Sequence, residues 1–555
     1  MDLNDYRKEI DSIDDQLIAL FAQRMETAEK IAEYKKANGL RVLDARREKE
    51  KMREILDKTP DDLREYVSSL YSLIFELSRS GERGILVNKA DAQVASSVEG
   101  VNALPEFLKR KEAPALPEIS QPRVLRHYAR LAQETLGADV NIEIGQGTCT
   151  VKYSPKVNDQ LANLPEMREM HPLQDASTCQ GIMEIMYNTD LYMREISGMD
   201  RFSFQPSGGS QGILGMASLV YAYYKSRGEE KQRNEIITTI YSHPSDAAAP
   251  HVKGFKIIYL HPDENGYPDY EAFKAAVNEH TAAFVVANPE DTGVYNKNVL
   301  KFTKLVHEAG GLCAYDQANA NGLLGVTRAR DAGFDMCFFN LHKTFSTPHG
   351  GGGPGSGPVG VKKHLMPFMP VPVLVERNGM IELDYDRPES FGRVKSFYGN
   401  FGVIVKAYAY IRSLGGKGLK EASENAVLNA NYIMNALRGT YEIPHDRICM
   451  HECVIAPGEL LDLGVHTTDI AKALIDRGYH PPTIYFPLIV HEAMMIEPTE
   501  TESRETLDEF IEAMKDIARE AKENPEAVHA CPVTTPVGRP DEVTAARKPV
   551  VRYTK

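Results

Sequence analysis

The sequence predicts a multidomain protein: an all-α segment at the N-terminus, then an α/β domain with a parallel-rich sheet, and a small α+β domain at the C-terminus. A chain of 555 residues is too long for one hydrophobic core. Residues 1–80 contain one glycine, Gly39, and carry apolar side chains at helical spacing. Residues 180–345 alternate short runs rich in Ala, Gly and large apolar side chains, which is typical of buried parallel strands with helices on both faces of the sheet.

The N-terminal segment is expected to form three helices, at about residues 2–37, 44–57 and 61–80. The apolar positions that define the first of them are Ile10, Ile13, Leu17, Leu20, Phe21 and Ile31. A first helix of this length exceeds the usual range for globular proteins, so it needs partner helices. One interpretation is therefore a helical hairpin that dimerises and leaves a charged face in solvent.

The composition argues against a nucleic-acid-binding, membrane or secreted protein. The formal net charge of −14 and the pI near 5.7 argue against nucleic acid or an anionic membrane as a partner. The chain contains no apolar run of about eighteen residues and is charged at its start, so neither a membrane span nor a secretory signal is expected. Seven scattered cysteines favour a reducing cytoplasm, and no group of Cys and His has the spacing of a metal site.

Lys343 is the most informative residue of the α/β region. It follows a predicted buried strand, residues 334–340, together with His342, and a glycine-rich stretch comes after it. Two earlier predicted strands, 281–287 and 311–315, are followed by Asn288 and Asp316. Pyridoxal phosphate needs a lysine for its Schiff base and a carboxylate to keep its ring nitrogen protonated. The ordered set predicts a pyridoxal phosphate site, although a lone lysine beside a flexible loop would be an exposed surface residue.

A phosphate cradle is expected upstream of these strands. Residues 205–212 read QPSGGSQG and precede an apolar helical run at 213–224. Small residues at a helix N-terminus leave backbone amides open to an anion. Gly209, Ser210 and Gln211 are therefore predicted to bind the cofactor, although alone they would indicate an ordinary Gly-Ser turn.

From about Leu73 onward the chain resembles subunit 2 of the two-subunit glycine dehydrogenase (decarboxylating), the P-protein of the glycine cleavage system. The motifs that carry the resemblance are LHKTFSTPHGGGGPGSGPV at 341–359, RVKSFYGNFG at 393–402 and PPTIYFPLIVHEAMMIEPTET at 481–501. The resemblance implies the pyridoxal-phosphate-dependent transferase fold type I, with Lys343 carrying the cofactor, Asp316 at its ring nitrogen and His243 near the ring. It also implies a first P-protein subunit and a lipoyl carrier protein as partners.

Several positions match or depart from that family's motifs. Cys149 and Lys152 persist where the family reads LGSCTMKYNPK, which implies a part in substrate binding. Gln211 replaces the imidazole that stacks on the cofactor ring. Asp246 stands in the family's His-Gly-Thr-Asn-Pro motif, and Glu290 and Asp291 stand in its Asn-Pro-Asn-Thr motif. Extra carboxylates repel a substrate carboxylate, so an amino acid other than glycine, for example an aromatic one, is an alternative substrate.

The first 82 residues resemble the all-helical chorismate mutases, with YRKEIDSID at 6–14 as the entry signature. Position by position, the resemblance assigns substrate binding to Arg7, Arg24, Lys35, Asp44, Arg47, Glu48, Ser78 and Glu82. Chorismate is a dianion, and its rearrangement needs cations and hydrogen-bond donors, here Lys35 and a protonated Glu82, at the breaking ether oxygen. The resemblance implies a homodimer. The alternative is a non-catalytic module that senses chorismate or prephenate, or only dimerises.

These observations predict a bifunctional cytoplasmic enzyme, an isomerase fused to an oxidoreductase subunit. Its first activity converts chorismate to prephenate. Its second is pyridoxal-phosphate-dependent decarboxylation of glycine with aminomethyl transfer to a lipoyl carrier protein. The expected domains are residues 1–82, a linker at 83–125, a large cofactor domain at 126–400 and a small domain at 401–555.

Overall fold

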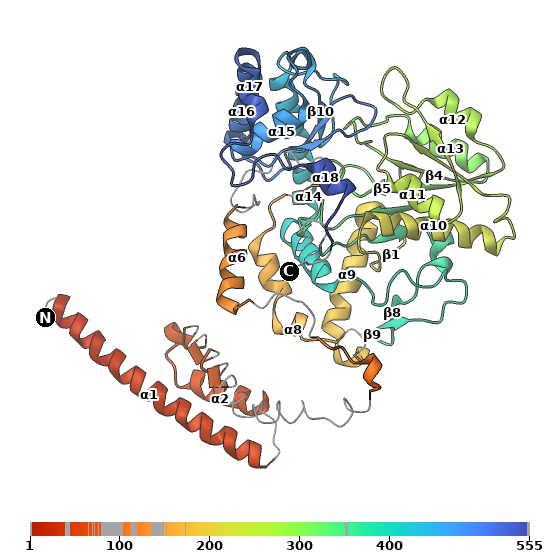
Figure 1. Ribbon diagram of the computed structural model, residues 1–555. Helices are drawn as coiled ribbons and strands as arrows, with labels where there is room; N and C mark the ends of the chain where they lie inside the picture. The colour runs from red at the N-terminus through yellow and green to blue at the C-terminus, as the bar shows by residue number, and fades with distance from the viewer. Residues whose placement is uncertain are drawn as a thin grey trace. The chain divides into compact units, whose positions relative to one another are not determined.

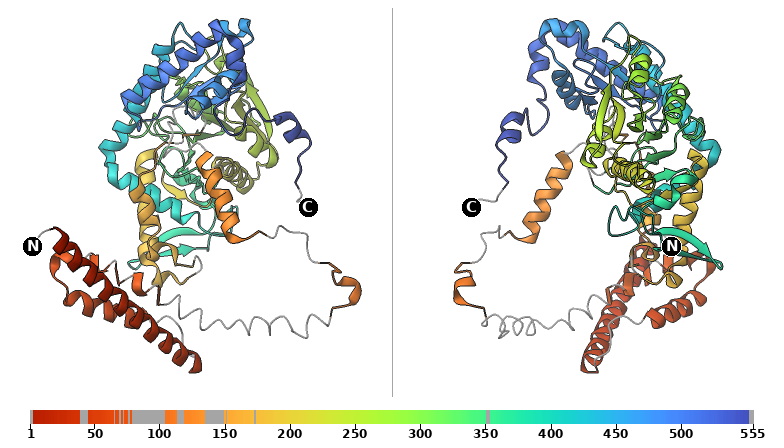
Figure 2. Two further views of the ribbon diagram at one scale, coloured as in Figure 1. Left: turned by 60° about the vertical axis from the view of Figure 1, so that its left-hand side comes forward. Right: turned by 90° about the vertical axis from the view of Figure 1, so that its right-hand side faces the viewer.

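The structure is a computed structural model that describes residues 3–38, 45–64, 66–68, 70–71, 73–75, 77–78, 104–112, 119–134, 149–150, 152–171, 174–349 and 353–551. The chain divides into two compact units, Met1–Glu118 and Ile119–Val551. Figures 1 and 2 show a helical first unit and a layered second unit. None of the described helices is both long enough and apolar enough to span a bilayer.

The first unit is helical, as predicted. Helix α1 covers Leu3–Ala37, α2 covers Ala45–Asp57, and the short helix η1 covers Asp61–Leu63. The described residues from 64 to 78 are also helical. A further short helix, η2, covers Glu106–Leu108.

Helix α1 is only partly covered within its unit. Ala28 and Ala32 are buried, and Arg24 beside them donates to Ser78 of the third helical segment. Much of the remaining apolar surface of the helix is exposed: Tyr6, Ile10, Ile13, Leu17, Ile18, Leu20, Phe21, Ile31 and Tyr34. So large an apolar surface marks an interaction site.

A seven-stranded sheet organises the second unit, in the order β1-β7-β6-β5-β4-β2-β3. Its strands are β1 (Arg201–Ser203), β2 (Glu235–Thr239), β3 (Lys256–Leu260), β4 (Thr281–Ala287), β5 (Leu312–Gln317), β6 (Met336–Phe339) and β7 (Val359–Val361). Strands β3, β2, β4, β5 and β6 are parallel, whereas β7 is antiparallel to both of its neighbours. The carboxyl ends of all strands except β7 therefore lie at one edge, where α/β proteins bind ligands. The predicted parallel-rich sheet is confirmed.

Alternate residues of the strands face two apolar cores. Phe284, Cys313 and Cys337 belong to the core that contains side chains of α9 (Gln180–Ser197), α13 (Val299–Glu308) and the first half of α14 (Phe401–Leu437). Ala314 and Met336 belong to the core on α10 (Gly209–Ser226). Helices thus cover both faces of the sheet, as the alternating sequence predicts.

A small α+β domain follows, as predicted. Its antiparallel sheet has the order β10-β12-β11, with bounds Cys453–Ile455, Met494–Ile496 and Thr483–Ile484. Its core also contains the second half of α14, together with α15 (Thr467–Asp476), α16 (Arg504–Glu523) and α17 (Pro525–Ala530). Gly415, with a φ of 64°, interrupts α14 between the two domains that the helix serves.

The remaining elements of the second unit are shorter or peripheral. They are α6 (Gln121–Glu134), α7 (Lys156–Ala162), α8 (Pro165–Arg168), η3 (Ala176–Thr178), α11 (Ser245–Val252), α12 (Tyr270–Ala276), η4 (Lys363–Phe368), β8 (Val373–Arg377), β9 (Met380–Asp384), η5 (Gly458–Leu463) and α18 (Glu542–Arg547).

Two elements at the carboxyl edge of the large sheet differ from their predicted bounds. Strand β5 runs to Gln317, so Asp316 belongs to the strand and pairs with Phe338 of β6. Helix α10 begins at Gly209 rather than at the apolar run, because Gln211 stabilises its first turn by accepting a hydrogen bond from Ser207 N (2.8 Å). Both differences bring polar groups nearer to Lys343 at the carboxyl edge.

Candidate active site

Lys343 lies in the turn after β6, at the carboxyl edge of the sheet. Its N–H donates to Asn340 O (3.1 Å), and Asn340 N donates to Ala318 O (3.2 Å). Thr344 Oγ1 accepts from Ala320 N (2.9 Å). These bonds tie the lysine turn to the loop after β5, and the lysine itself is 6 % exposed. The side-chain amine is thereby held on a rigid support, as a reactive group requires.

A small pocket of about 30 Å³ opens beside this amine. Its lining residues come from five segments and are His243, Ala287, Pro289, Asp291, Asp316, Ala318, Asn319, Lys343, His451 and Glu452. The structure therefore brings together three of the predicted site residues, Lys343, Asp316 and His243. Asp316 is held in place at the end of β5, because its Oδ1 accepts from Ala318 N (2.7 Å).

His243 precedes α11 and is oriented by that helix. Its Nδ1 accepts from Ser245 N (3.2 Å) and lies 2.7 Å from Ser245 Oγ. Burial lowers the pKa of His243, and the nearby Lys343 acts in the same direction against the Asp316 carboxylate. The ring is therefore neutral near pH 7, a state suited to packing against a flat heterocycle.

The N-terminus of α10 forms an anion cradle at the same edge. Helix geometry leaves its first amides without an acceptor inside the helix, and no side chain caps it at Gly208. A Cβ on Gly355 would lie 2.5 Å from Ser207 O, and a Cβ on Gly357 would lie 2.5 Å from Gly208 O. The glycine-rich loop after Lys343 therefore packs backbone to backbone against the start of the helix. A phosphate fits such a site, because the N–H groups and the helix dipole both favour an anion.

His342 connects the lysine turn to this cradle. Its Nδ1 accepts from Ser356 N (3.3 Å), and its ring lies 5.1 Å from that of His349. Burial, with the nearby Lys343, lowers the pKa of His342 to about 3, so the ring is neutral. It can position the glycine-rich loop without adding charge.

Lys152 and Cys149 lie near residues of this site, since Lys152 acts on His451 and Cys149 on His349. The Lys152 ammonium donates to Asn321 Oδ1 (2.9 Å), Tyr410 OH (3.0 Å) and Glu500 Oε1 (2.7 Å). Burial opposes its charge, yet the Glu500 carboxylate and Tyr410 raise the pKa of Lys152, so it stays protonated. A hydrogen bond with Cys149 raises the pKa of His349.

Arg24 is the centre of the candidate site in the first unit. Its Nη1 donates to Ser78 Oγ (2.5 Å), and its guanidinium carbon lies 5.8 Å from the centre of the Phe75 ring. A pocket of about 440 Å³ opens there, lined by Leu20, Gln23, Arg24, Thr27, Ala28, Ile31 and Ser78. Two of the predicted chorismate ligands thus share one pocket.

Comparison with known proteins places both units in families. Over 484 residues the chain is 49% identical to the "Probable glycine dehydrogenase (decarboxylating) subunit 2" of Caldanaerobacter subterraneus subsp. tengcongensis, which covers 87% of this chain and 99% of that one. It is 47% identical to the protein of the same description from Pyrococcus abyssi, covering 87% of this chain and 95% of that one.

The chain belongs to the glycine dehydrogenase (decarboxylating) subunit 2 family. Family profiles agree: residues 422–531 match the glycine dehydrogenase C-terminal domain, 212–371 match aminotransferase class V and 6–83 match chorismate mutase type II. This glycine dehydrogenase subunit 2 family member therefore carries an N-terminal chorismate mutase type II domain.

Solved structures confirm the fold of the second unit. The inhibitor-bound glycine decarboxylase (P-protein) of the glycine cleavage system superposes with a TM-score of 0.64 at 20% identity, over 78% of this chain and 98% of that one. A cysteine desulfurase from Thermococcus onnurineus NA1 superposes with a TM-score of 0.54 at 16% identity, over 73% and 100%. At these identities the likeness concerns the fold alone.

Pyridoxal phosphate is the cofactor of this fold and family, and the residues present fit it. The buried lysine, the carboxylate of Asp316 and the open amides of α10 stand at one edge of the sheet. The acceptor Ser356 Oγ and the acceptor Asn340 Oδ1 are buried there without a partner among the described residues. Unpaired buried polar atoms are costly, so a ligand that binds them is expected.

Other predicted cofactor residues have partners within the protein. Both ends of the Asn288 amide bind Asn296: Oδ1 accepts from its N–H (2.7 Å) and Nδ2 donates to its C=O (3.2 Å). Gln211 is bound to Ser207, as described above, and Ser210 is exposed in the first turn of α10. The amide groups of Asn288 and Gln211 are therefore bound to other residues of the glycine dehydrogenase subunit 2 fold.

The remaining predicted chorismate ligands are scattered along the first unit. Lys35 lies three turns from Arg24 on the same face of α1, whereas Arg7 lies seventeen residues, about 25 Å, toward the other end. Arg47 is exposed on α2, with its Nη1 3.9 Å from Glu54. Asp44 and Glu82 lie outside the described residues, as does the side chain of Glu48.

Buried carboxyl groups surround the pocket of this subunit 2 relative. Glu290 accepts from Thr239 Oγ1 (2.9 Å) and Ser242 Oγ (2.8 Å). Burial raises its pKa to about 8, despite those hydrogen bonds. Burial also raises the pKa of Asp291 to about 7, against the effect of Lys343. Asp291 therefore lines the pocket and is partly ionised near pH 7, whereas Glu290 is largely neutral there.

His451, Glu452 and Glu497 are site residues that the sequence analysis missed. His451 and Glu452 line the pocket, and Glu497 accepts from Thr150 Oγ1 (2.5 Å) and Asn319 Nδ2 (2.9 Å). They come from the start of β10 and the end of β12, in the small domain. The sequence signal for these residues was their position: two adjacent titratable residues precede one buried strand, and a glutamate directly follows another.

We expect the apo chain to lose stability as the pH rises from about 6.5 to 8. The folded chain keeps protons on Glu290, Asp291 and Glu497, whose pKa values are raised to about 8, 7 and 7. The unfolded chain releases these protons above about pH 4.5, so each carboxyl lowers the free energy of unfolding by up to about 1.4 kcal/mol per pH unit until the pH passes its folded pKa, and by almost nothing above it. Buried neutral histidines increase the free energy of unfolding as the pH rises, but only below about pH 6.5. The predicted pH range therefore begins there.

Calorimetric melting temperatures of the apo chain measure this effect. Glu290→Gln removes one of the titrations and should make the slope shallower. A melting temperature that is constant or rises over this range contradicts the prediction.

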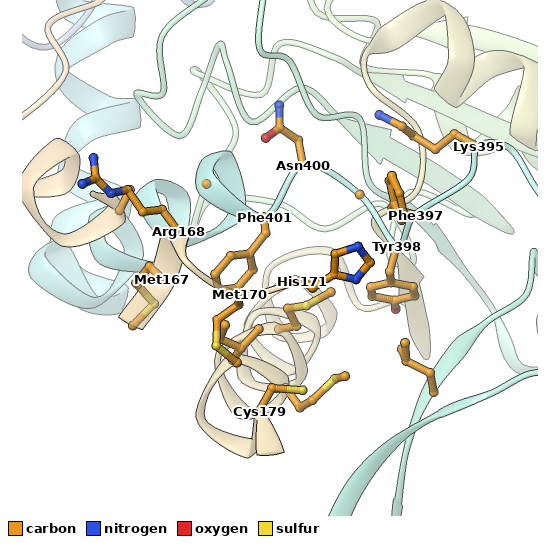
Figure 3. A pocket seen from close by; sticks show the side chains of 17 residues that line it. Met167, Arg168, Met170, His171, Cys179, Lys395, Phe397, Tyr398, Asn400 and Phe401 are labelled. Atoms are coloured by element: carbon orange, nitrogen blue, oxygen red, sulfur yellow. The ribbon is translucent and has the colours of Figure 1, made fainter. Parts of the chain in front are cut away.

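A separate apolar pocket of about 400 Å³ lies beside the cradle. Figure 3 shows Met167, Met170 and Phe401 at its wall, with His171 and Arg168 nearby. The loop that closes it also holds the cradle: Lys395 Nζ donates to Ser207 Oγ (2.7 Å) and Asn400 Nδ2 donates to Gly355 O (3.4 Å). Movement of this loop would therefore be transmitted to the α10 amides.

Proposed function

We propose that the protein is bifunctional: its first unit converts chorismate to prephenate, and its second unit decarboxylates glycine and passes the aminomethyl group to a lipoyl carrier protein. The observation that carries the second activity is the pocket in which Lys343, Asp316 and His243 meet beside the α10 amides. The first rests on the Arg24–Ser78 pocket within the chorismate mutase type II match.

In the second unit each residue has a distinct task. Pyridoxal phosphate, when bound, supplies the electron sink for loss of the substrate carboxylate. The first-turn amides of α10 would hold its phosphate, and Lys343 would hold it through the side-chain amine. Asp316 would keep the ring nitrogen protonated, and neutral His243 would pack at the ring. His342 keeps the glycine-rich loop against the cradle.

Binding of the substrate and of partners extends this proposal. Lys152 offers a fixed positive charge near the pocket, and Cys149 lies close by, so both are assigned to substrate binding. The name of the relatives, subunit 2, supports a first P-protein subunit as a partner. Cytoplasmic localisation and the domain limits 1–82, 83–125, 126–400 and 401–555 belong to the same proposal.

A second candidate substrate follows from the buried acids. Asp291 lines the pocket at Lys343, and its Oδ2 is buried without a hydrogen-bond partner among the described residues. When ionised, this carboxyl repels the carboxylate of a small amino acid. The observation favours an amino acid other than glycine, such as an aromatic one, as the alternative.

In the first unit the proposal requires two chains. Arg24 and Lys35, on one face of α1, contact chorismate together with Ser78 of the third helical segment, and Lys35 with Glu82 meets its ether oxygen. Arg47 and Glu48, of α2, and Asp44 complete the set. Arg7 is about 25 Å from Arg24 along a single straight helix, so it can serve only the site of a second copy. The exposed apolar residues of α1 give a homodimer its contact surface.

An amino-acid scan tests the second activity. The chain loaded with pyridoxal phosphate is mixed with glycine, phenylalanine, tyrosine and other amino acids, and the shift of its visible absorbance is recorded. Exchange of labelled carbon dioxide into glycine is then measured with and without a first subunit. A shift and exchange with glycine support the proposal. A shift only with an aromatic amino acid supports the alternative, and no shift with any amino acid contradicts both.

A further inference from the structure

Asp246 places a second carboxyl group against Asp316. Asp246 is the second residue of α11 and is 0% exposed. Both of its carboxyl oxygens are buried without a hydrogen-bond partner among the described residues. The Asp316 carboxyl lies within hydrogen-bonding reach of it and already accepts one bond from Ala318 N. Two acceptors thus face each other, Asp246 fully buried and Asp316 at the wall of the pocket.

The charged groups around this pair do not neutralise it. Glu290 and Asp291, from the segment after β4, are neutral or negative and, where ionised, add negative potential at Asp246. The cation Lys343 acts on Asp291, and His243 is neutral. Burial and the Asp316 carboxyl raise the pKa of Asp246 well above its usual range. Two ionised carboxylates in contact repel each other strongly. A single proton held between them removes this repulsion and forms a hydrogen bond that involves both groups.

We propose that Asp246 and Asp316 share one proton, and that Asp246, as the donor of this pair, positions Asp316 and sets how firmly the ring nitrogen of the cofactor keeps its proton. The inference rests on the cofactor site of the proposed function. The pair then carries one negative charge. Asp246 is a positioning residue, because it acts through Asp316 and does not touch the cofactor.

The strength of the hydrogen bond that residue 246 donates to Asp316 determines whether the ring nitrogen of the cofactor holds its proton more or less firmly. A carboxylic O–H donates a shorter and stronger hydrogen bond to a carboxylate than an amide N–H does. The bond from Asp246 therefore weakens Asp316 as an acceptor for the ring N–H. Asp246→Asn keeps the shape and a weaker donor, so Asp316 binds the ring proton more firmly in this variant.

The shared proton is tested first in the full-length apo chain. Infrared difference spectra of wild type and Asp246→Asn at pH 7 should show the loss of one carboxylic acid C=O band in the variant. If no such band is lost, Asp246 is ionised and the proposal is overturned. Should Asp246→Asn fail to fold, Asp316→Asn serves instead: the Asp246 band should shift, because its O–H then donates to an amide oxygen, and an unchanged band overturns the proposal.

The positioning role is tested with pyridoxal phosphate labelled with ¹⁵N in its ring. The ring nitrogen should lose its proton at a pH about one unit higher in Asp246→Asn than in wild type, a tenfold tighter hold. Glu290→Gln is the matched control, because it removes a buried acid that is bonded to Thr239 and Ser242 and acts on Asp246 only through its charge, so its shift should be smaller than that of Asp246→Asn. Equal titrations of wild type and Asp246→Asn overturn the positioning role. If neither chain binds the cofactor while the infrared band is lost, the proposed function fails and proton sharing stands.

Discussion

Lys343→Ala is expected to abolish the visible absorbance of lysine-bound pyridoxal phosphate and to lower glycine–carbon dioxide exchange by about 10³-fold or more. The effect is large because the pocket holds no second amine in the place of Lys343 among its described lining residues. Prephenate formation should be retained, because its residues lie in the other unit. Absorbance spectra, exchange assays and borohydride reduction followed by peptide mass spectrometry measure these outcomes.

Lys256→Ala is the matched control for this variant. Lys256 lies on β3 of the same sheet, and its ammonium is exposed and paired with Glu235 (2.7 Å). Its loss should leave the absorbance unchanged. A reducible cofactor linkage in Lys343→Ala would contradict the assignment and would direct attention to Lys152, whose amine is bonded to Asn321, Tyr410 and Glu500 nearby.

Arg24→Ala is expected to reduce prephenate formation by about 10²- to 10³-fold, the usual cost of removing one donor from a site that stabilises developing negative charge. Arg24 is held by Ser78 and lies against Phe75, so its guanidinium is already oriented toward the pocket. Arg24→Lys keeps the charge but loses the planar fork, and we expect it to recover only part of the rate. The rate is measured by the loss of chorismate absorbance.

The same variant separates a mutase from a sensor. If wild type binds chorismate without forming prephenate, and Arg24→Ala removes the binding alone, the first unit is a regulatory module. Equal rates in wild type and Arg24→Ala would contradict the assigned site. Glycine exchange, measured in parallel, should be unchanged by the substitution.

Parallel-sheet topology explains why part of the site is predictable from sequence. Asp316 and Lys343 each follow a buried apolar run, and the carboxyl ends of neighbouring parallel strands meet at one edge. Glu452 lines the same pocket from the start of an antiparallel strand in another domain, and Glu497, after a second such strand, lies beside Glu452. No local pattern relates those strands to Lys343, more than one hundred residues earlier, so only the packed structure identifies them.

The hydrogen-bond partners of loop side chains also cannot be predicted from the sequence. Asn288 follows β4 as a cofactor ligand would, yet its amide is bound at both ends to Asn296. Asp246 stands out as an acid in the sequence, but its contact with Asp316 depends on how α11 packs against α10, β2 and β3. Residue type and strand position predict which chemistry is present, whereas hydrogen-bond geometry determines which residues perform it.

Because helix α1 is incompletely covered, the two activities are expected to depend differently on the concentration of the chain. Association of two chains follows mass action, so below the dissociation constant the paired fraction rises in proportion to the amount of chain. Under the pairing proposed above, mutase output would then increase with the square of expression level, whereas any activity complete within one chain would increase linearly. The ratio of the two activities in a cell would thus report how much of the protein is made.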